Sequence, residues 1–128
     1  MENRTNISSG AKWEEIVGYS RAVRIGNCIE VSGTTAVDHN GDVVGIDNPY
    51  EQTRFILSKI GKALEQAGTS FENVIRTRIY VTNISCWEEI GKAHGEVFRT
   101  IKPAATMLQV SKLIDPLLLV EIEVSAIF

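Results

Sequence analysis

Two carboxylates near the end of the chain, Glu121 and Glu123, are the side chains best suited to handle protons or water. They lie two residues apart, so a β-strand would present both on one face. In a partly dry cleft, a carboxylate can hold a water molecule for attack and pass on its proton, particularly where burial raises its pKa. The alternative role is an ion pair with a neighbouring arginine. We expect that role for Glu123, and both roles stay open for Glu121.

His94 is a second candidate for proton transfer, because histidine titrates near neutral pH. It falls on the apolar stripe of an expected helix, one turn after Gly91. An isolated histidine on such a stripe is more often a packed core or interface residue, so both interpretations stay open. His39 stands beside an Asn-Gly turn, where we expect it to be exposed.

The elements that would position these residues begin with a β-hairpin. Residues 19–25 alternate between two faces, Gly26-Asn27 can turn the chain, and residues 28–35 alternate again. Residues 1–12 have little apolar pattern and predict a loose lead-in. A second tight turn is predicted at residues 39–42, which contain the Asn-Gly dipeptide.

Two helices are predicted. Residues 48–51 combine an Asn cap, a Pro at the first helical position and a Glu in the first turn, and Gly68 ends the apolar stripe that follows. Residues 85–88 form a second capping box, and Pro103 marks the end of the helix that it opens. The apolar face of this second helix is expected to hold Trp87, Ile90, Val97 or Phe98, and Ile101.

Strands are predicted at residues 73–83, 105–111 and 119–128. With the hairpin and helices, they predict an α+β fold with one mixed sheet and both helices on one face. On the last strand, an apolar side suits the helices, and the opposite side mixes acidic and apolar residues. Arg76, Arg78 and Tyr80 are expected on that opposite side, which is typical of a surface that packs against copies of itself. The alternative is a solvated sheet face.

Composition restricts the function further. The 128 residues form one expected domain, 1–128, and the net charge of -3 disfavours nucleic acid as a partner. We find no signal peptide, no apolar run that could span a bilayer and no metal-ligand spacing. Cys28 and Cys86 stand alone and read as free thiols. These observations predict a cytoplasmic protein without a membrane or metal association.

Several short motifs, in order over residues 17–128, resemble those of the RidA/YjgF family. Each motif alone would be weak evidence for the resemblance, and together the motifs are strong evidence. They include Tyr19-Ser20-x-Ala22-Val23, Val31-Ser32-Gly33-Thr34, Trp87-x3-Gly91-x2-His94-x3-Phe98, Lys102-Pro103-Ala104 and Val120-Glu121-Ile122-Glu123.

This resemblance implies a chorismate-mutase-like fold and a homotrimer whose sheets form a central barrel. It also implies small-molecule clefts between neighbouring subunits, and activity without a metal or organic cofactor. Family members with the full site hydrolyse reactive enamines and imines, such as 2-aminoacrylate, to 2-keto acids and ammonia.

The resemblance also implies roles for individual residues. Glu121 takes the position of the acid that positions or activates water, and Tyr19 that of the cleft tyrosine. Gly33 and Thr34 match the strand end whose backbone lines the cleft, where a glycine permits close approach. Met107 stands where the family often has cysteine, and its thioether would make a soft apolar wall.

One position departs from the family pattern. Ala105 stands where the family arginine binds the substrate carboxylate, so the chain resembles the arginine-lacking branches of the family. Losing such an anchor costs about 2–5 kcal/mol of binding. Either the ligand lacks a carboxylate, or another arginine supplies the charge. The candidates for that replacement are Arg21, Arg24, Arg76 and Arg78.

Three functions therefore remain. The first is the hydrolysis of an enamine or imine, with Glu121 and His94 handling the proton and water. The second is the binding of a small metabolite without catalysis. The third follows from family members described as endoribonucleases or translation inhibitors, and the acidic net charge makes it the weakest.

Overall fold

A computed structural model describes residues 3–128. Six strands and three α-helices alternate along the chain, with two short 3-10 helices at Phe71–Asn73 and Ile84–Cys86. In order, the larger elements are β1 (Arg4–Ile7), α1 (Lys12–Val17), β2 (Ala22–Ile25), β3 (Cys28–Thr35), α2 (Pro49–Gln66), β4 (Val74–Val81), α3 (Trp87–Phe98), β5 (Ala104–Gln109) and β6 (Val120–Ile127).

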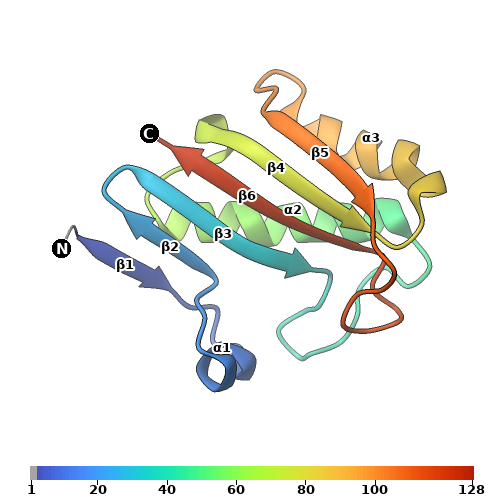
Figure 1. Ribbon diagram of the computed structural model, residues 1–128, viewed down its shortest axis with the longest axis horizontal. Helices are drawn as coiled ribbons and strands as arrows, with labels where there is room; N and C mark the ends of the chain where they lie inside the picture. Colours follow the sequence, from blue (N-terminus) through green and yellow to red (C-terminus); the bar gives the residue numbers. More distant parts are fainter. Residues whose placement is uncertain (1–2) are drawn as a thin grey trace.

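All six strands join one mixed sheet in the order β1-β2-β3-β6-β4-β5. The β4–β5 pair is parallel, and the other pairs are antiparallel. Helices α2 and α3 lie side by side behind the sheet, and no helix within residues 3–128 covers its opposite face (Figure 1). The predicted α+β class and the placement of two helices on one face are confirmed. The uncovered side is called the open face below.

Helix packing and strand alternation create the core between the helices and the sheet. Along β6, alternate residues are almost fully buried against the helices. Their partners from α2 follow the predicted stripe, from Thr53 through Leu57 and Ile60 to Leu64. The buried residues of β6 are Val120, Ile122, Val124 and Ala126.

The start of α2 confirms the predicted cap. The side chain of Asn48 accepts a hydrogen bond from the amide of Glu51 at 3.0 Å, and Pro49 occupies the first helical position. The chain leaves this helix through Gly68, whose φ of 93° suits a residue without a Cβ.

The start of α3 differs from its prediction. Cys86 is the N-cap without a side-chain bond, and Asn83 instead caps the preceding 3-10 turn by accepting from the amide of Ser85 at 3.0 Å. The helix therefore begins one residue later than the predicted cap implies. Trp87, predicted on the apolar face, is its first residue and is 56% exposed.

The predicted loose lead-in at residues 1–12 is wrong for Arg4–Ile7, which pairs with β2 as an edge strand. Only Ile7 in this strand is buried, so the sequence lacks apolar alternation, and backbone pairing is what holds the strand. Helix α1 follows and was also not predicted. Residues 1 and 2 of the lead-in lie outside the described residues.

Two irregularities interrupt the central strands. Between Val31 and Thr34, β3 carries one residue more than its partner β6, so Ser32 and Gly33 form a bulge. A similar shift between Val74 and Arg76 leaves Ile75 49% exposed, whereas Val74 and Thr77 on either side of it are buried. The first bulge lies next to the candidate site.

Candidate functional site

Glu121 projects from β6 onto the open face, where it pairs in register with Thr35 of β3 and Tyr80 of β4. The side chain is half-buried, and its carboxylate has no hydrogen-bond partner among residues 3–128. Burial raises the pKa of Glu121; the nearby charge of Arg21 lowers it in part, and that of Glu123 raises it. A carboxyl group in this setting is suited to exchange a proton.

Gly33 lies directly against Glu121. A Cβ atom on Gly33 would overlap Oε2 of Glu121 and come within 3.0 Å of its Cδ, so the glycine makes room for the carboxylate. The side chain of Thr34 points the other way. It is 1% exposed, and its hydroxyl donates to the carbonyl of Ser32 at 2.8 Å. Thr34 can therefore offer a ligand only its backbone.

Arg21 and Tyr19 border the same corner of the sheet. The guanidinium of Arg21 donates to the carbonyl of Gly33 at 2.6 Å, and its Cζ lies 6.0 Å from the centre of the Tyr19 ring. Tyr19 is 39% exposed, so its phenol is open to solvent. The structure thus brings Tyr19, Gly33 and Glu121 together, as the family resemblance implied, and adds Arg21 to them.

Lys59 approaches this corner from α2, and no role was predicted for it. Its Nζ donates to the carbonyls of Thr35 and Val37 at 2.8 and 2.9 Å. Burial and, after it, the charge of Arg21 lower the pKa of Lys59 to about 8. Its position beside the buried Ile60 on the helical stripe was the only available signal.

The other predicted site residues lie on the opposite, helix-bearing side of the sheet. Nε2 of His94 is 3.0 Å from the hydroxyl of Thr77, and the imidazole packs 4.6 Å from the ring of Phe98. Burial lowers the pKa of His94, which favours the neutral form. Ala105 pairs with Thr77, and Met107 packs against the core, so both share this side. Within one chain, the sheet therefore separates His94, Ala105 and Met107 from Glu121.

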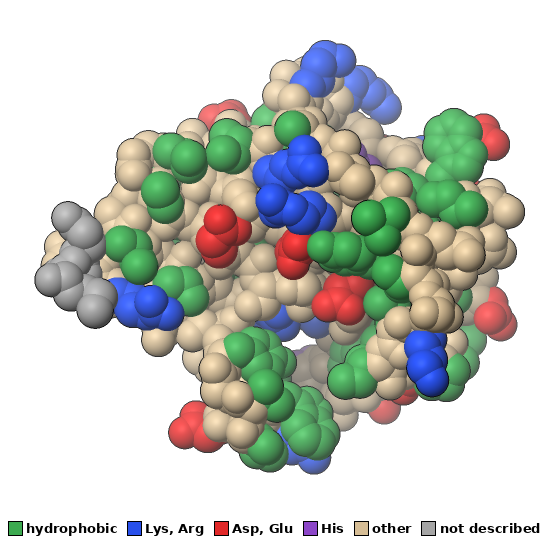
Figure 2. Space-filling model, in the orientation of Figure 1, with side chains coloured by type: hydrophobic (Ala, Val, Ile, Leu, Met, Phe, Trp, Pro, Cys, Tyr) green, Lys and Arg blue, Asp and Glu red, His purple; other side chains and the backbone are tan. Residues whose placement is uncertain are grey.

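Charged pairs occupy the middle of the open face. Glu123 accepts a hydrogen bond from the hydroxyl of Tyr80 at 2.7 Å and lies 3.9 Å from Nε of Arg78. Arg76 donates to the hydroxyl of Thr106 on the neighbouring strand at 2.7 Å. Basic, acidic and apolar side chains accordingly meet across this face (Figure 2). Glu123 thus has the ion pair that was expected for it, and Glu121 has none.

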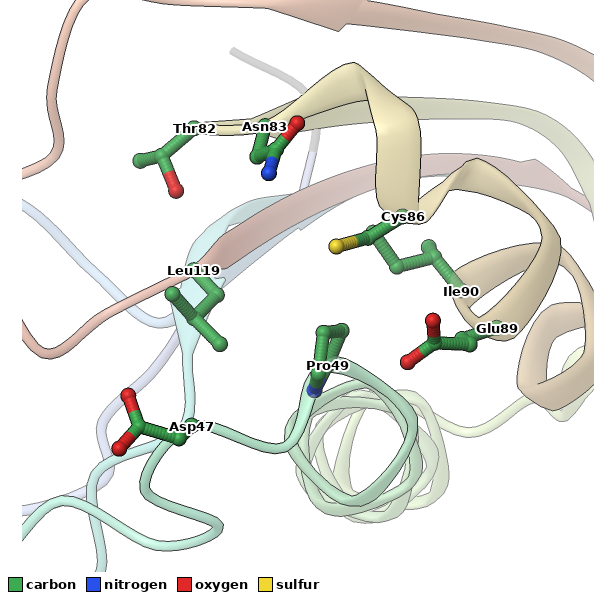
Figure 3. A pocket seen from close by; sticks show the side chains of 8 residues that line it. All are labelled: Asp47, Pro49, Thr82, Asn83, Cys86, Glu89, Ile90 and Leu119. Carbon is green, nitrogen blue, oxygen red and sulfur yellow. The ribbon is translucent and has the colours of Figure 1, made fainter.

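A separate cavity of about 270 Å³ lies between the first turns of α2 and α3. Cys86 and Glu89 approach it from the α3 side and Asp47 and Pro49 from the α2 side (Figure 3). None of the predicted site residues lines it. Among residues 3–128, no three His, Cys, Asp or Glu side chains gather as a metal site, and no helix is long and apolar enough to cross a membrane.

Comparison with known proteins places this chain in a family. The family model described as "Endoribonuclease L-PSP" matches residues 10–128. The chain belongs to this family, which is also called RidA/YjgF. The match includes all seven residues that were predicted for the site.

Relatives from several organisms agree with this assignment. An uncharacterized protein of Streptomyces coelicolor is 39% identical over 121 residues, covering 94% of this chain and 89% of its own. A RutC family protein of Pyrococcus horikoshii is 33% identical over 109 residues, with 84% and 85% covered.

Solved structures of RidA/YjgF proteins have the same fold. A Mycobacterium tuberculosis protein described as a member of the YjgF/YER057c/UK114 family has a TM-score of 0.90 and 48% identity, covering 98% of this chain and all of its own. A Yersinia pestis protein of the Rid family, described as of unknown function, has a TM-score of 0.87 and 30% identity, with 98% and 100% covered.

Proposed function

We propose that this RidA/YjgF protein hydrolyses reactive enamines or imines to a carbonyl compound and ammonia, in clefts shared between the subunits of a homotrimer. The observation that carries the proposal is the state of Glu121. Its carboxylate is half-buried, has no hydrogen-bond partner among residues 3–128, and has a raised pKa. Those are the properties of a group that is suited to take up and release a proton.

The reaction needs one water molecule and one proton relay. Glu121 takes a proton from water as the oxygen attacks the C=N carbon and returns it to the nitrogen, which gives a carbinolamine. Glu121 then passes the hydroxyl proton of this intermediate to the nitrogen as the C–N bond breaks, so that imine plus water gives carbonyl plus ammonia. Tyr19, whose phenol is exposed beside this corner, orients the water or the substrate. Gly33 keeps the space over Glu121 free of a side chain.

The placement of the remaining site residues supports a shared cleft. Glu121 lies on the open face, whereas His94, Ala105 and Met107 lie on the helix-bearing side. A cleft that contains both groups therefore takes them from two chains. The open face, with its mixed charged and apolar side chains, forms the surface on which the subunits associate. His94, bonded to Thr77 and neutral, shapes the cleft wall in this arrangement rather than donating a proton.

The direct test is hydrolysis of 2-aminoacrylate generated in the assay, with pyruvate and ammonia measured. We expect acceleration by the wild-type protein and a loss of about 10²-fold or more in Glu121→Gln, the range of general acid–base catalysis. Glu121 must be ionised to accept a proton from water, and burial raises its pKa above the ordinary value for a glutamate, so the activity falls as pH drops through that raised pKa.

The matched control is Glu123→Gln. It removes a carboxylate from the same strand face but leaves Glu121 in place, so we expect a much smaller effect on turnover. An equal loss of turnover in both variants would show that the reaction depends on the charge of the open face as a whole, and not on Glu121. No acceleration by the wild-type protein would exclude this substrate.

Binding without catalysis is the second candidate, and the alanine at position 105 favours it. In that case small carboxylates or amines raise the melting temperature without turnover. RNA cleavage, which the family description suggests, is disfavoured by the net charge of -3, and incubation with single-stranded RNA tests it.

A further inference from the structure

Arg21 carries a half-buried charge that forms no salt bridge among residues 3–128. The only hydrogen bond of its side chain to these residues goes to a neutral acceptor, the carbonyl of Gly33. Its Nε atom is buried without any partner, and no described carboxylate lies within 4 Å of the guanidinium. A buried, unpartnered N–H is costly, so such an atom is normally satisfied by a ligand or a water molecule.

The other arginines that could replace the family anchor are already engaged. Arg24 donates to the carbonyls of Gly26 and Ala67 and stacks 4.5 Å from the centre of the Phe128 ring. Arg76 bonds to Thr106, and Arg78 pairs with Glu123. Each of these three arginines therefore already has a structural partner within the chain.

Only Arg21 adjoins the proposed catalytic carboxylate. Gly33 links the two, because its carbonyl accepts from Arg21 while its missing Cβ makes room for Glu121. An anion bound to the guanidinium would therefore lie beside the group that handles water. The exposed ring of Tyr19 closes another side of this position.

Lys59 adds a second positive charge to the corner. Two of its protons are used by the carbonyls of Thr35 and Val37. The carboxylate of Glu14 lies near Arg21, but it is bound by the hydroxyls of Ser8 and Ser9. Glu121 and Asp38 also act on these two cations from nearby, yet neither Arg21 nor Lys59 forms a salt bridge among residues 3–128. The guanidinium can therefore still pair with an added anion.

We propose that Arg21 binds the carboxylate of the substrate, replacing from β2 the arginine that this chain lacks at position 105. The inference rests on the proposed function and gives it a substrate class: short imines or enamines with a carboxylate next to the C=N carbon. A guanidinium is suited to this task because its planar N–H groups match both carboxylate oxygens.

The test combines turnover with binding. Losing a buried charge-assisted contact of this kind weakens binding by about 30- to 5000-fold. We therefore expect Arg21→Gln to raise KM for 2-aminoacrylate at least 30-fold while kcat changes less, and Arg21→Lys to fall between that variant and the wild type. KM for a neutral imine without a carboxylate stays the same. Arg54→Gln, which removes a solvent-exposed arginine, is the control.

A binding measurement separates this inference from the proposed catalysis. In calorimetric titrations with pyruvate as the probe, the wild type binds and Arg21→Gln does not, whether or not turnover occurs. Binding without turnover by the wild type overturns the proposed function and keeps the role of Arg21. Equal pyruvate binding by both proteins, or none by the wild type, overturns the role of Arg21.

An independent readout shows that Arg21→Gln remains folded with its corner intact. In the wild type, Lys59 titrates at about 8, partly because of the charge of Arg21. NMR of the unmodified protein with 13Cε-labelled lysine should show this pKa moving upward in Arg21→Gln. The double variant Arg21→Gln with Ala105→Arg restores carboxylate binding, because it returns the family anchor.

Discussion

At the scale of single residues, Gly33 brings two charged side chains to one point of the backbone. Its carbonyl binds Arg21, and the absence of a Cβ leaves room for the carboxylate of Glu121. A larger residue at position 33 would displace the carboxylate of Glu121, and it would do so without first disturbing the core. A substitution of Gly33 can therefore test the site while it leaves the fold nearly intact.

Gly33→Ala tests this point. The added methyl group displaces the end of a flexible, half-exposed side chain, so we expect the free energy of unfolding to change by no more than about 1 kcal/mol. Turnover should fall much more than stability, because the carboxylate moves. The measurements are urea unfolding and initial rates on the same preparation.

Gly95→Ala provides the comparison. A Cβ at Gly95, in α3, meets no atom within 4 Å, and alanine favours a helix over glycine. This variant should keep full turnover and gain slightly in stability. A Gly33→Ala protein that matches it in turnover would mean that the position of the carboxylate has no effect on the reaction.

Much of the residue-scale site could be predicted from the sequence, and part of it could not. The resemblance to family motifs singled out Glu121, Gly33 and Tyr19, and these residues border one corner of the structure, although their roles stay predictions. Lys59 was missed because it is far from them in sequence and joins them only through the packing of α2 on β3. The free N–H of Arg21 depends on three-dimensional contacts that no spacing reveals.

At the scale of elements, helix boundaries show what local sequence can decide. The cap of α2 depends on neighbouring residues alone, and Asn48 makes the predicted bond to the amide of Glu51. The start of α3 depends on how β4 ends. A 3-10 turn capped by Asn83 comes first, and the predicted cap from Ser85 is not formed. The bulge in β3 was likewise invisible, because pairing with β6 creates it.

These two helix starts give paired predictions. Asn48→Ala removes a side-chain cap and should lower the free energy of unfolding by about 1 kcal/mol. Ser85→Ala should change it by only a few tenths, because the Ser85 side chain caps nothing. Urea unfolding of both variants measures the difference. Equal losses would mean that the hydroxyl of Ser85 stabilises α3 after all.

At the scale of the whole molecule, the sheet divides the candidate site between its two faces. Helices cover one face, and the other remains open with its charged pairs (Figures 1 and 2). The sequence predicted this division through the alternation of β4 and β6. It could not show that Glu121 and Ala105 lie on opposite sides, since that follows from the pairing of β4 with β5. A site that uses both faces needs more than one chain.

Subunit mixing tests this central claim most directly. Glu121→Gln disables one half of the proposed cleft, and Ala105→Asp should disable the other by repelling the substrate carboxylate; each protein alone should be inactive. After the two are unfolded together, refolded and assayed for imine hydrolysis, random association should return about a quarter of wild-type activity, because one shared cleft in four receives two intact halves. No recovery from folded, mixed oligomers would contradict a cleft built from two chains.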